Sequence, residues 1–228
     1  MGVINILCLP YAGGSASVVT DVLAGKLDKN RFTAVPLELP GRGMRFGEEC
    51  ALTTDELYEA IDSLLSDYTQ QAAPYYLLGH SMGGELLPHL YHKIIERGGT
   101  PPKGLIICGA EPPEHLTLAA TDEASLLTEM KKGGATSEEF FESPELVELF
   151  LPIVQADYRL LNSLVSQIPE PIDCELIVIN GKEDAEALEH HEDWRSYTTA
   201  ECSFFQVDGG HFFITENTET AAIINKAI

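Results

Sequence analysis

Basic residues are scarce in this chain of 228 residues: 14 lysines and arginines stand against 36 aspartates and glutamates, a formal net charge of −22. A surface of that charge repels phosphate backbones and anionic lipid headgroups, which argues against nucleic-acid or membrane binding. The chain also lacks an uninterrupted apolar run of about 18 residues, the length that a membrane-spanning helix needs. We therefore expect no nucleic acid and no membrane among its partners.

Cysteine and metal-binding patterns are also sparse. The five cysteines include no C-x-x-C pair, and a scattered odd number fits reduced thiols better than a disulfide framework. The seven histidines show no H-E-x-x-H spacing, and the pair His190-His191 stands in a polar stretch, so no metal site is expected. The first residues form a short apolar run without a basic flank, which favours a strand over a signal peptide. We expect a cytoplasmic protein.

Apolar residues make up 44% of the chain, enough for a large core. The length suits one α/β domain over residues 1–228. Several short apolar runs show no polar alternation, which is typical of parallel strands covered by helices on both faces. Strands that alternate with helical patterns predict a doubly wound, mostly parallel sheet. The expected strands span residues 3–9, 33–39, 75–80, 104–110, 175–180 and 203–207.

Two helical patterns matter for the organisation. A capping box, Thr53-x-x-Glu56, predicts the start of an amphipathic helix. Residues 112–168 contain no convincing strand and carry helical apolar patterns instead, with a flexible break expected at Gly133-Gly134. We interpret this segment as a helical lid inserted above the carboxyl edge of the sheet, where ligands bind in open α/β folds. The alternative is an ordinary pair of crossover helices, for which the segment is long.

The strongest chemical signal is the sequence GHSMG at residues 79–83, directly after an apolar run. The pattern G-x-S-x-G is that of a nucleophile elbow, in which the chain turns sharply from strand to helix with the serine, here Ser81, at the apex. The N–H groups at the start of the following helix can stabilise a developing oxyanion. An inert serine in a glycine-rich turn is the alternative, and the flanking strand and helix patterns argue against it.

An activated serine needs a base, and that base needs an acid to orient it. In α/β-hydrolases the partners follow in the order serine, acid, histidine. His211 lies in the loop DGGHFF at residues 208–213, after an expected strand, and is the candidate base. Asp184 ends the segment GKED after the preceding strand and is the candidate acid. The competing acids are Glu183, Glu186, Asp193 and Asp208.

An oxyanion hole requires two backbone N–H groups. One is expected from Met82, the residue after the nucleophile. The other is expected from Ala12, in the loop PYAGGS at residues 10–15 after the first strand. This loop has neither G-x-G-x-x-G nor G-x-x-x-x-G-K-[ST] spacing, which argues against a nucleotide site.

Five segments occur in an order that resembles a known family. They read PYAGG, LPGRGMR, GHSMGG, LPIVQADY and DGGHFF, and they begin at residues 10, 39, 79, 151 and 208. Together they resemble the type II thioesterases of nonribosomal peptide and polyketide synthesis, over nearly the whole chain. The chain departs from the family at Gln155, where an arginine is usual, and at Glu183, where an aspartate is frequent.

The resemblance implies a stand-alone editing hydrolase of the α/β-hydrolase superfamily. Such enzymes remove stalled or wrong acyl groups from the phosphopantetheine thiol of carrier proteins. It implies Ser81, Asp184 and His211 as the triad and Ala12 and Met82 as oxyanion donors. No cofactor is expected, the expected partner is an acyl- or peptidyl-carrier protein, and we expect a monomer.

Two alternatives stay open at this point. A general carboxylesterase or lipase acting on free small esters would share the same residues, and a catalytically dead hydrolase fold would serve as a binding protein. The net charge of −22 opposes the approach of a carrier protein, because carrier proteins are themselves usually acidic. Basic residues that could receive a carrier are Lys131, Lys132, Arg42, Arg45 and Arg159; the alternative is that they form internal salt bridges or stay solvated.

Overall fold

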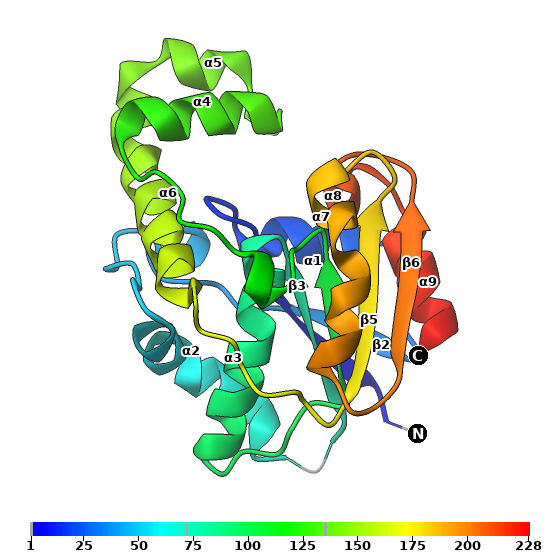
Figure 1. Ribbon diagram of the computed structural model, residues 1–228. Coiled ribbons are helices and arrows are strands. Elements are labelled where there is room, and N and C mark those ends of the chain that lie inside the picture. Colours follow the sequence, from blue (N-terminus) through cyan, green and yellow to red (C-terminus); the bar gives the residue numbers. More distant parts are fainter. Residues whose placement is uncertain (1, 72, 135) are drawn as a thin grey trace.

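Six apolar segments form one parallel sheet in the computed structural model, which describes residues 2–71, 73–134 and 136–228 (Figure 1). The strand order across the sheet is β2-β1-β3-β4-β5-β6, and all five pairings are parallel. The chain order reverses between β1 and β3, so a crevice is expected at their carboxyl ends. The strands are β1 (Ile4–Leu9), β2 (Phe32–Pro36), β3 (Tyr75–His80), β4 (Gly104–Cys108), β5 (Glu175–Gly181) and β6 (Cys202–Val207).

The predicted α/β class and all six expected strands are present. The second strand is shorter than predicted, because it ends at Pro36 instead of continuing to residue 39. Proline has no N–H to continue the ladder. The Leu37 N–H still donates to the Cys8 carbonyl at 2.9 Å, and the chain then leaves the sheet.

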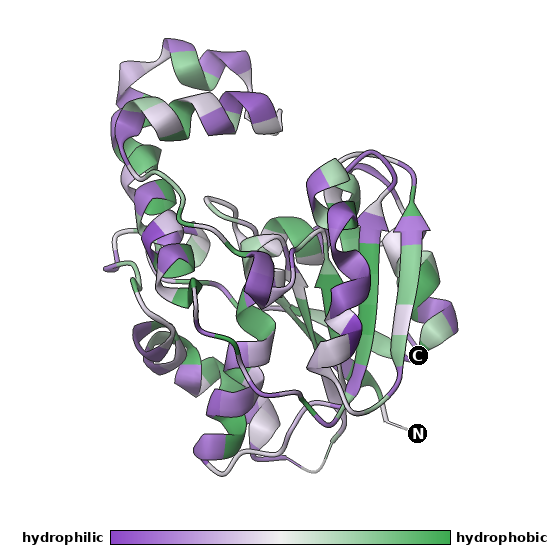
Figure 2. Ribbon diagram, in the orientation of Figure 1, coloured by the Kyte–Doolittle hydropathy of each residue, from purple (hydrophilic) through white to green (hydrophobic). Residues whose placement is uncertain are grey.

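Helices cover both faces of the sheet and enclose two apolar cores. On one face α2, α3 and the end of α6 pack on the strands, and on the other face α1, α8 and α9 do so. The central strands are apolar along most of their length (Figure 2). The helices are α1 (Ala16–Ala24), α2 (Thr54–Thr69), α3 (Met82–Glu96), α4 (Glu123–Gly133), α5 (Glu138–Glu142), α6 (Pro144–Leu164), α7 (Ala185–Glu189), α8 (Phe213–Glu216) and α9 (Glu219–Ala227), with single-turn helices η1 (Gly43–Arg45), η2 (Pro113–His115) and a longer η3 (His191–Tyr197).

The expected capping box at the start of α2 forms in part. The Thr53 side chain accepts a hydrogen bond from the Glu56 N–H at 3.3 Å, as predicted. The Glu56 carboxylate accepts from the Leu52 N–H at 2.8 Å rather than from Thr53. It therefore reaches one residue further back and still satisfies a backbone donor ahead of the helix.

The segment 112–168 is helical throughout its described elements, with no strand among them. Helices α4 and α5 stand away from the sheet, and the long α6 connects them to it (Figure 1). Leu151 and Val154 of α6 pack with Leu126 of α4, whereas Leu160 belongs to the main core. The expected break falls where α4 ends, since Gly134 caps the helix in the left-handed conformation with a φ of 75°.

All five cysteines are free thiols, and Cys8 and Cys108 are buried in strands. Burial raises the pKa of the Cys8 thiol to about 12, so this side chain serves as a small apolar residue. Across the described residues, none of the helices combines the length and the apolar character needed to cross a membrane.

Candidate active site

Ser81 lies at the apex of a sharp turn between β3 and α3. Its backbone has a φ of 52° and a ψ of −122°, a strained conformation for a residue with a side chain. Glycines make the turn possible. A Cβ on Gly79 would stand 2.2 Å from the Gly83 backbone, and one on Gly83 would stand 2.7 Å from the Leu9 carbonyl oxygen. The end of β1 therefore lies directly against the first turn of α3.

Three side chains from distant loops form a continuous chain of hydrogen bonds. His211 Nε2 lies 2.9 Å from Ser81 Oγ, and His211 Nδ1 lies 2.8 Å from Asp184 Oδ2. The Asp184 side chain is only 5% exposed and the His211 side chain is 37% exposed, so the imidazole can reach a bound molecule. Burial alone would raise the pKa of Asp184, but the hydrogen bond and charge of His211 lower it overall. The carboxylate is thus ionised and can orient the imidazole.

The competing acids form no hydrogen bond to the His211 imidazole, although Glu183 and Glu186 line cavities beside it. Asp208 pairs with Lys182 and Asp193 with His115, while Glu186 pairs with Lys132. Glu183 lines a cavity beside Ser81 but makes no hydrogen bond to His211 among the described residues. Only Asp184 meets the imidazole. It does so from the N-cap position of α7, where its other oxygen accepts from the Ala187 N–H at 3.3 Å.

His80 supports the loop that carries His211, a role that we did not predict from the sequence. Its Nε2 lies 2.7 Å from the His211 backbone oxygen, and its side chain is fully buried. Burial and the nearby charge of His211 lower the pKa of His80 to about 3, so its imidazole is neutral and donates this hydrogen bond. The sequence signal for this role is that His80 directly precedes Ser81 in the G-x-S-x-G pattern.

The loop after β1 is held by a buried ion pair. The Gly13 N–H donates to Asp157 Oδ2 at 2.6 Å. Arg42 donates to both oxygens of the same carboxylate, each at 2.6 Å. Ala12, the predicted oxyanion donor, lines a cavity together with Ser81, and Met82 is the first residue of α3. Arg42 and Asp157 belong to the separate segments LPGRGMR and LPIVQADY, and nothing in these segments predicts that the two side chains pair.

Most of the basic residues considered for a carrier surface have internal partners. Arg42 is 5% exposed beside Asp157, and Arg45 forms an ion pair with Glu48. Lys132 pairs with Glu186, and the Lys131 ammonium lies over the Phe141 ring. Arg159 is exposed on α6. The alternative of internal salt bridges therefore holds for the two arginines at residues 42 and 45.

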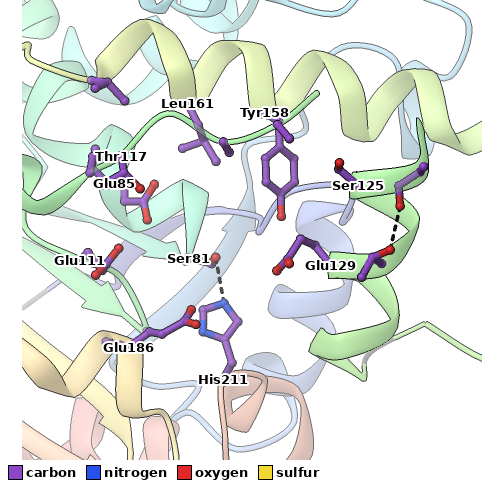
Figure 3. Close-up of a pocket in the computed structure, with 18 residues that line it drawn as sticks. Ser81, Glu85, Glu111, Thr117, Ser125, Glu129, Tyr158, Leu161, Glu186 and His211 are labelled. Atoms are coloured by element: carbon purple, nitrogen blue, oxygen red, sulfur yellow. Dashed lines mark hydrogen bonds between the residues drawn. The ribbon is translucent and has the colours of Figure 1, made fainter. Parts of the chain in front are cut away.

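Two cavities meet at Ser81 and His211. The Glu85 cavity, of about 760 Å³, lies between α3, the loop after β4 and the segment 112–168 (Figure 3). The Phe140 cavity, of about 690 Å³, lies between the loop after β1 and the α4–α5 region. Tyr158, Glu129 and Glu186 line both. Space on two sides of the serine suits a substrate that extends in both directions from its reacting carbonyl.

One group of potential metal ligands was not predicted. Ligand atoms of His115, His190 and Asp193 lie within 4.8 Å of one another. The rings of His115 and His190 stack 3.7 Å apart at 7°, so their lone pairs run nearly parallel and do not converge on a shared ion. His115 Nε2 also contacts Asp193 Oδ2 at 2.8 Å. This geometry fits a hydrogen-bonded surface cluster.

Comparisons with known proteins identify the family. A family model described as a thioesterase domain matches residues 5–228. Thioesterase PikA5 of Streptomyces venezuelae is 26% identical over 220 residues, 93% of this chain and 76% of the relative. Two solved structures, each 27% identical, give TM-scores of 0.87 for ClbQ from the colibactin NRPS/PKS pathway and 0.86 for the RedJ thioesterase from the prodiginine pathway of Streptomyces coelicolor. They cover 98% and 99% of this chain, and 96% and 90% of their own. These likenesses confirm the α/β-hydrolase fold, and the chain belongs to the thioesterase family.

Proposed function

We propose that this thioesterase hydrolyses acyl thioesters held on the phosphopantetheine arm of carrier proteins, and so clears stalled or wrong acyl groups in nonribosomal peptide and polyketide synthesis. Ser81 is the nucleophile, His211 the base and Asp184 the acid. The observation that carries the proposal is the chain of hydrogen bonds from Ser81 through His211 to Asp184, located where two cavities meet.

In the first half of the reaction, Ser81 Oγ attacks the thioester carbonyl while His211 Nε2 takes its proton. Asp184 stabilises the imidazolium that forms. The negative charge on the carbonyl oxygen is received by the backbone N–H groups of Met82 and Ala12. The carbon–sulfur bond then breaks, and His211 passes the proton from Ser81 to the departing sulfur, so that pantetheine leaves as a thiol and the imidazole is neutral again.

In the second half, a water molecule enters and His211 takes one of its protons. The resulting hydroxide attacks the acyl carbonyl, and the same two N–H groups again receive the oxyanion. When this intermediate collapses, the bond to Ser81 breaks and His211 returns the proton to Oγ. The free carboxylic acid leaves, and no cofactor is consumed.

The carrier-bound substrate is supported by the relatives and by the cavities. ClbQ comes from an NRPS/PKS pathway and RedJ from a prodiginine pathway. We also propose that residues 112–168 act as a lid, because α4 and α6 line both cavities and α5 adds Phe140 to the lining of the Phe140 cavity. We propose a cytoplasmic location, in keeping with its five free cysteines, and a monomeric state.

Intact-mass measurement of an acylated carrier protein tests the reaction. We expect the wild type to remove the acyl mass and Ser81→Ala to leave it in place.

A second comparison separates the thioesterase from a general esterase: kcat/KM should be higher for the acyl-carrier thioester than for a p-nitrophenyl ester with the same acyl group. A preference for the free ester would contradict the proposed substrate.

A further inference from the structure

The Glu85 cavity has an acidic lining beside the candidate nucleophile. It holds four carboxylates, and no lysine or arginine is among the described residues that line it. Figure 3 shows these groups around Ser81 and His211. The four are Glu85 from α3, Glu111 from the loop after β4, Glu129 from α4 and Glu186 from α7.

Two of these carboxylates lack a cationic partner. Glu129 and Glu186 both approach Lys132, at 3.9 and 3.2 Å. Neither Glu85 nor Glu111 forms a salt bridge within the described part of the chain. Burial and the charge of Glu111 raise the pKa of Glu85 to about 7, even though a helix N-terminus favours a carboxylate. Glu85 thus lacks a salt-bridge partner that would favour its ionised form, and a cation brought into the cavity would lower its pKa.

The position of Glu85 on α3 directs its side chain toward Ser81. It is in the first turn of α3, four residues after Ser81. In an α-helix each Cα–Cβ bond tilts toward the N-terminus, so the Glu85 side chain projects back toward the serine. Figure 3 shows its carboxylate directed into the cavity. Glu85 and Ser81 line the same cavity, so an acyl group bound there would face both side chains.

The two cavities also differ in the cations that line them. The Phe140 cavity also has four carboxylates, those of Glu129, Glu183, Asp184 and Glu186. Lys132 lines this cavity and not the Glu85 cavity. The Phe140 cavity further holds aromatic side chains, those of Tyr11, Phe140, Phe150 and Phe212. A lysine beside apolar surface suits the phosphate and the uncharged body of a pantetheine arm. The Glu85 cavity, which has no lysine or arginine in its described lining, then remains for the acyl group.

We infer that the Glu85 cavity binds an acyl group that carries a protonated amine close to its carbonyl, as an aminoacyl thioester does, and that Glu85 with Glu111 is its counterion. This inference rests on the proposed thioester hydrolysis and names its substrate class. An ammonium that enters the cavity supplies the missing positive charge, whereas a purely alkyl acyl chain gains nothing from these carboxylates and leaves them desolvated.

Glycyl- and propionyl-pantetheine thioesters provide a matched pair, since an ammonium replaces a methyl group of similar size. The variant is Glu85→Gln, and Glu96→Gln is its control, because Glu96 is exposed at the far end of the same helix. We expect Glu85→Gln to lower kcat/KM for the glycyl thioester about tenfold, a loss of one charge pair. The propionyl thioester should change by less than about twofold, and Glu96→Gln should change neither.

Equal losses on both thioesters would overturn the inference, because they would show that Glu85 acts on catalysis and not on the choice of acyl group.

Binding of amide analogues, in which N–H replaces the thioester sulfur, needs no turnover. Calorimetry should show that the wild type binds the glycyl amide more tightly than the propionyl amide, and that Glu85→Gln removes this preference. Equal binding by the wild type would contradict the inference. A wild type that hydrolyses neither thioester nor an acylated carrier would instead contradict the proposed function.

Discussion

Arg42 and Asp157 lie 115 residues apart and meet in a buried two-pronged ion pair, with Nη1–Oδ2 and Nη2–Oδ1 distances of 2.6 Å. Their side chains are 5% and 1% exposed. The same carboxylate accepts the Gly13 N–H, so one contact joins the loop after β2, the middle of α6 and the loop that carries Ala12. The pair therefore links the helical segment 112–168 to the loop beside Ser81.

Asp157→Asn should destabilise the fold strongly. The amide keeps the shape but leaves the Arg42 charge buried without a counterion, which costs about 3–5 kcal/mol. Urea unfolding should show this loss. The double variant Arg42→Met/Asp157→Leu replaces the pair with apolar groups and should be less destabilised than the single variant. A double variant whose loss equals the sum of the losses of Arg42→Met and Asp157→Leu, each measured alone, would contradict the idea that the pair acts as a unit.

Asp184→Asn should lower kcat by about 10⁴-fold with little change in stability, because an amide can stabilise the wrong imidazole tautomer. Single-turnover hydrolysis of an acyl thioester measures the loss. Asp208→Asn is the control, since Asp208 pairs with Lys182 on the exposed surface. It should retain nearly full activity. Comparable losses in the two variants would remove the argument for Asp184 as the acid.

His80→Ala should reduce kcat and stability together. The substitution removes the donor to the His211 carbonyl and opens space in the core, at a cost of about 2–4 kcal/mol. With its support gone, the loop can no longer hold the imidazole against Ser81. His80→Gln keeps a donor and should recover part of kcat. If kcat of His80→Ala stays at the wild-type level while stability falls, His80 serves the core alone and not the position of His211.

The stability of the wild type relative to Glu85→Gln should fall as pH rises from about 4.5 to about 7. The pKa of Glu85 is raised in the fold to about 7 from an ordinary 4.5, so the folded state binds more protons than the unfolded state between these values. Stability then decreases with rising pH through this window. Glu111 and His211, whose charges act on Glu85, stay in both proteins. Thermal melting across pH 4 to 8 measures the difference in Tm; a constant difference would exclude a raised pKa.

Much of the fold and part of the site could be predicted from local patterns. The strands could be predicted because parallel strands that are buried on both faces consist of continuous apolar runs in the sequence. Ser81 was visible because the elbow requires glycines at fixed offsets, two of which would clash with the backbone if they bore a side chain. His211 followed from its glycine-rich loop after the last strand. Each of these patterns lies within a short stretch of the chain, where neighbouring residues determine the local backbone geometry.

Contacts between distant segments were decided only by the tertiary structure. Several acids competed for His211, and loop geometry alone brings Asp184 Oδ2 to 2.8 Å from it. Nothing in the sequence paired Arg42 with Asp157, because a buried ion pair depends on which loops meet, not on their spacing. The same holds for the charge in the Glu85 cavity: four glutamates spread over 101 positions, from Glu85 to Glu186, gather beside one serine. Local sequence determined the elements and the candidate nucleophile, whereas packing of the elements determined which charges face each other across the site.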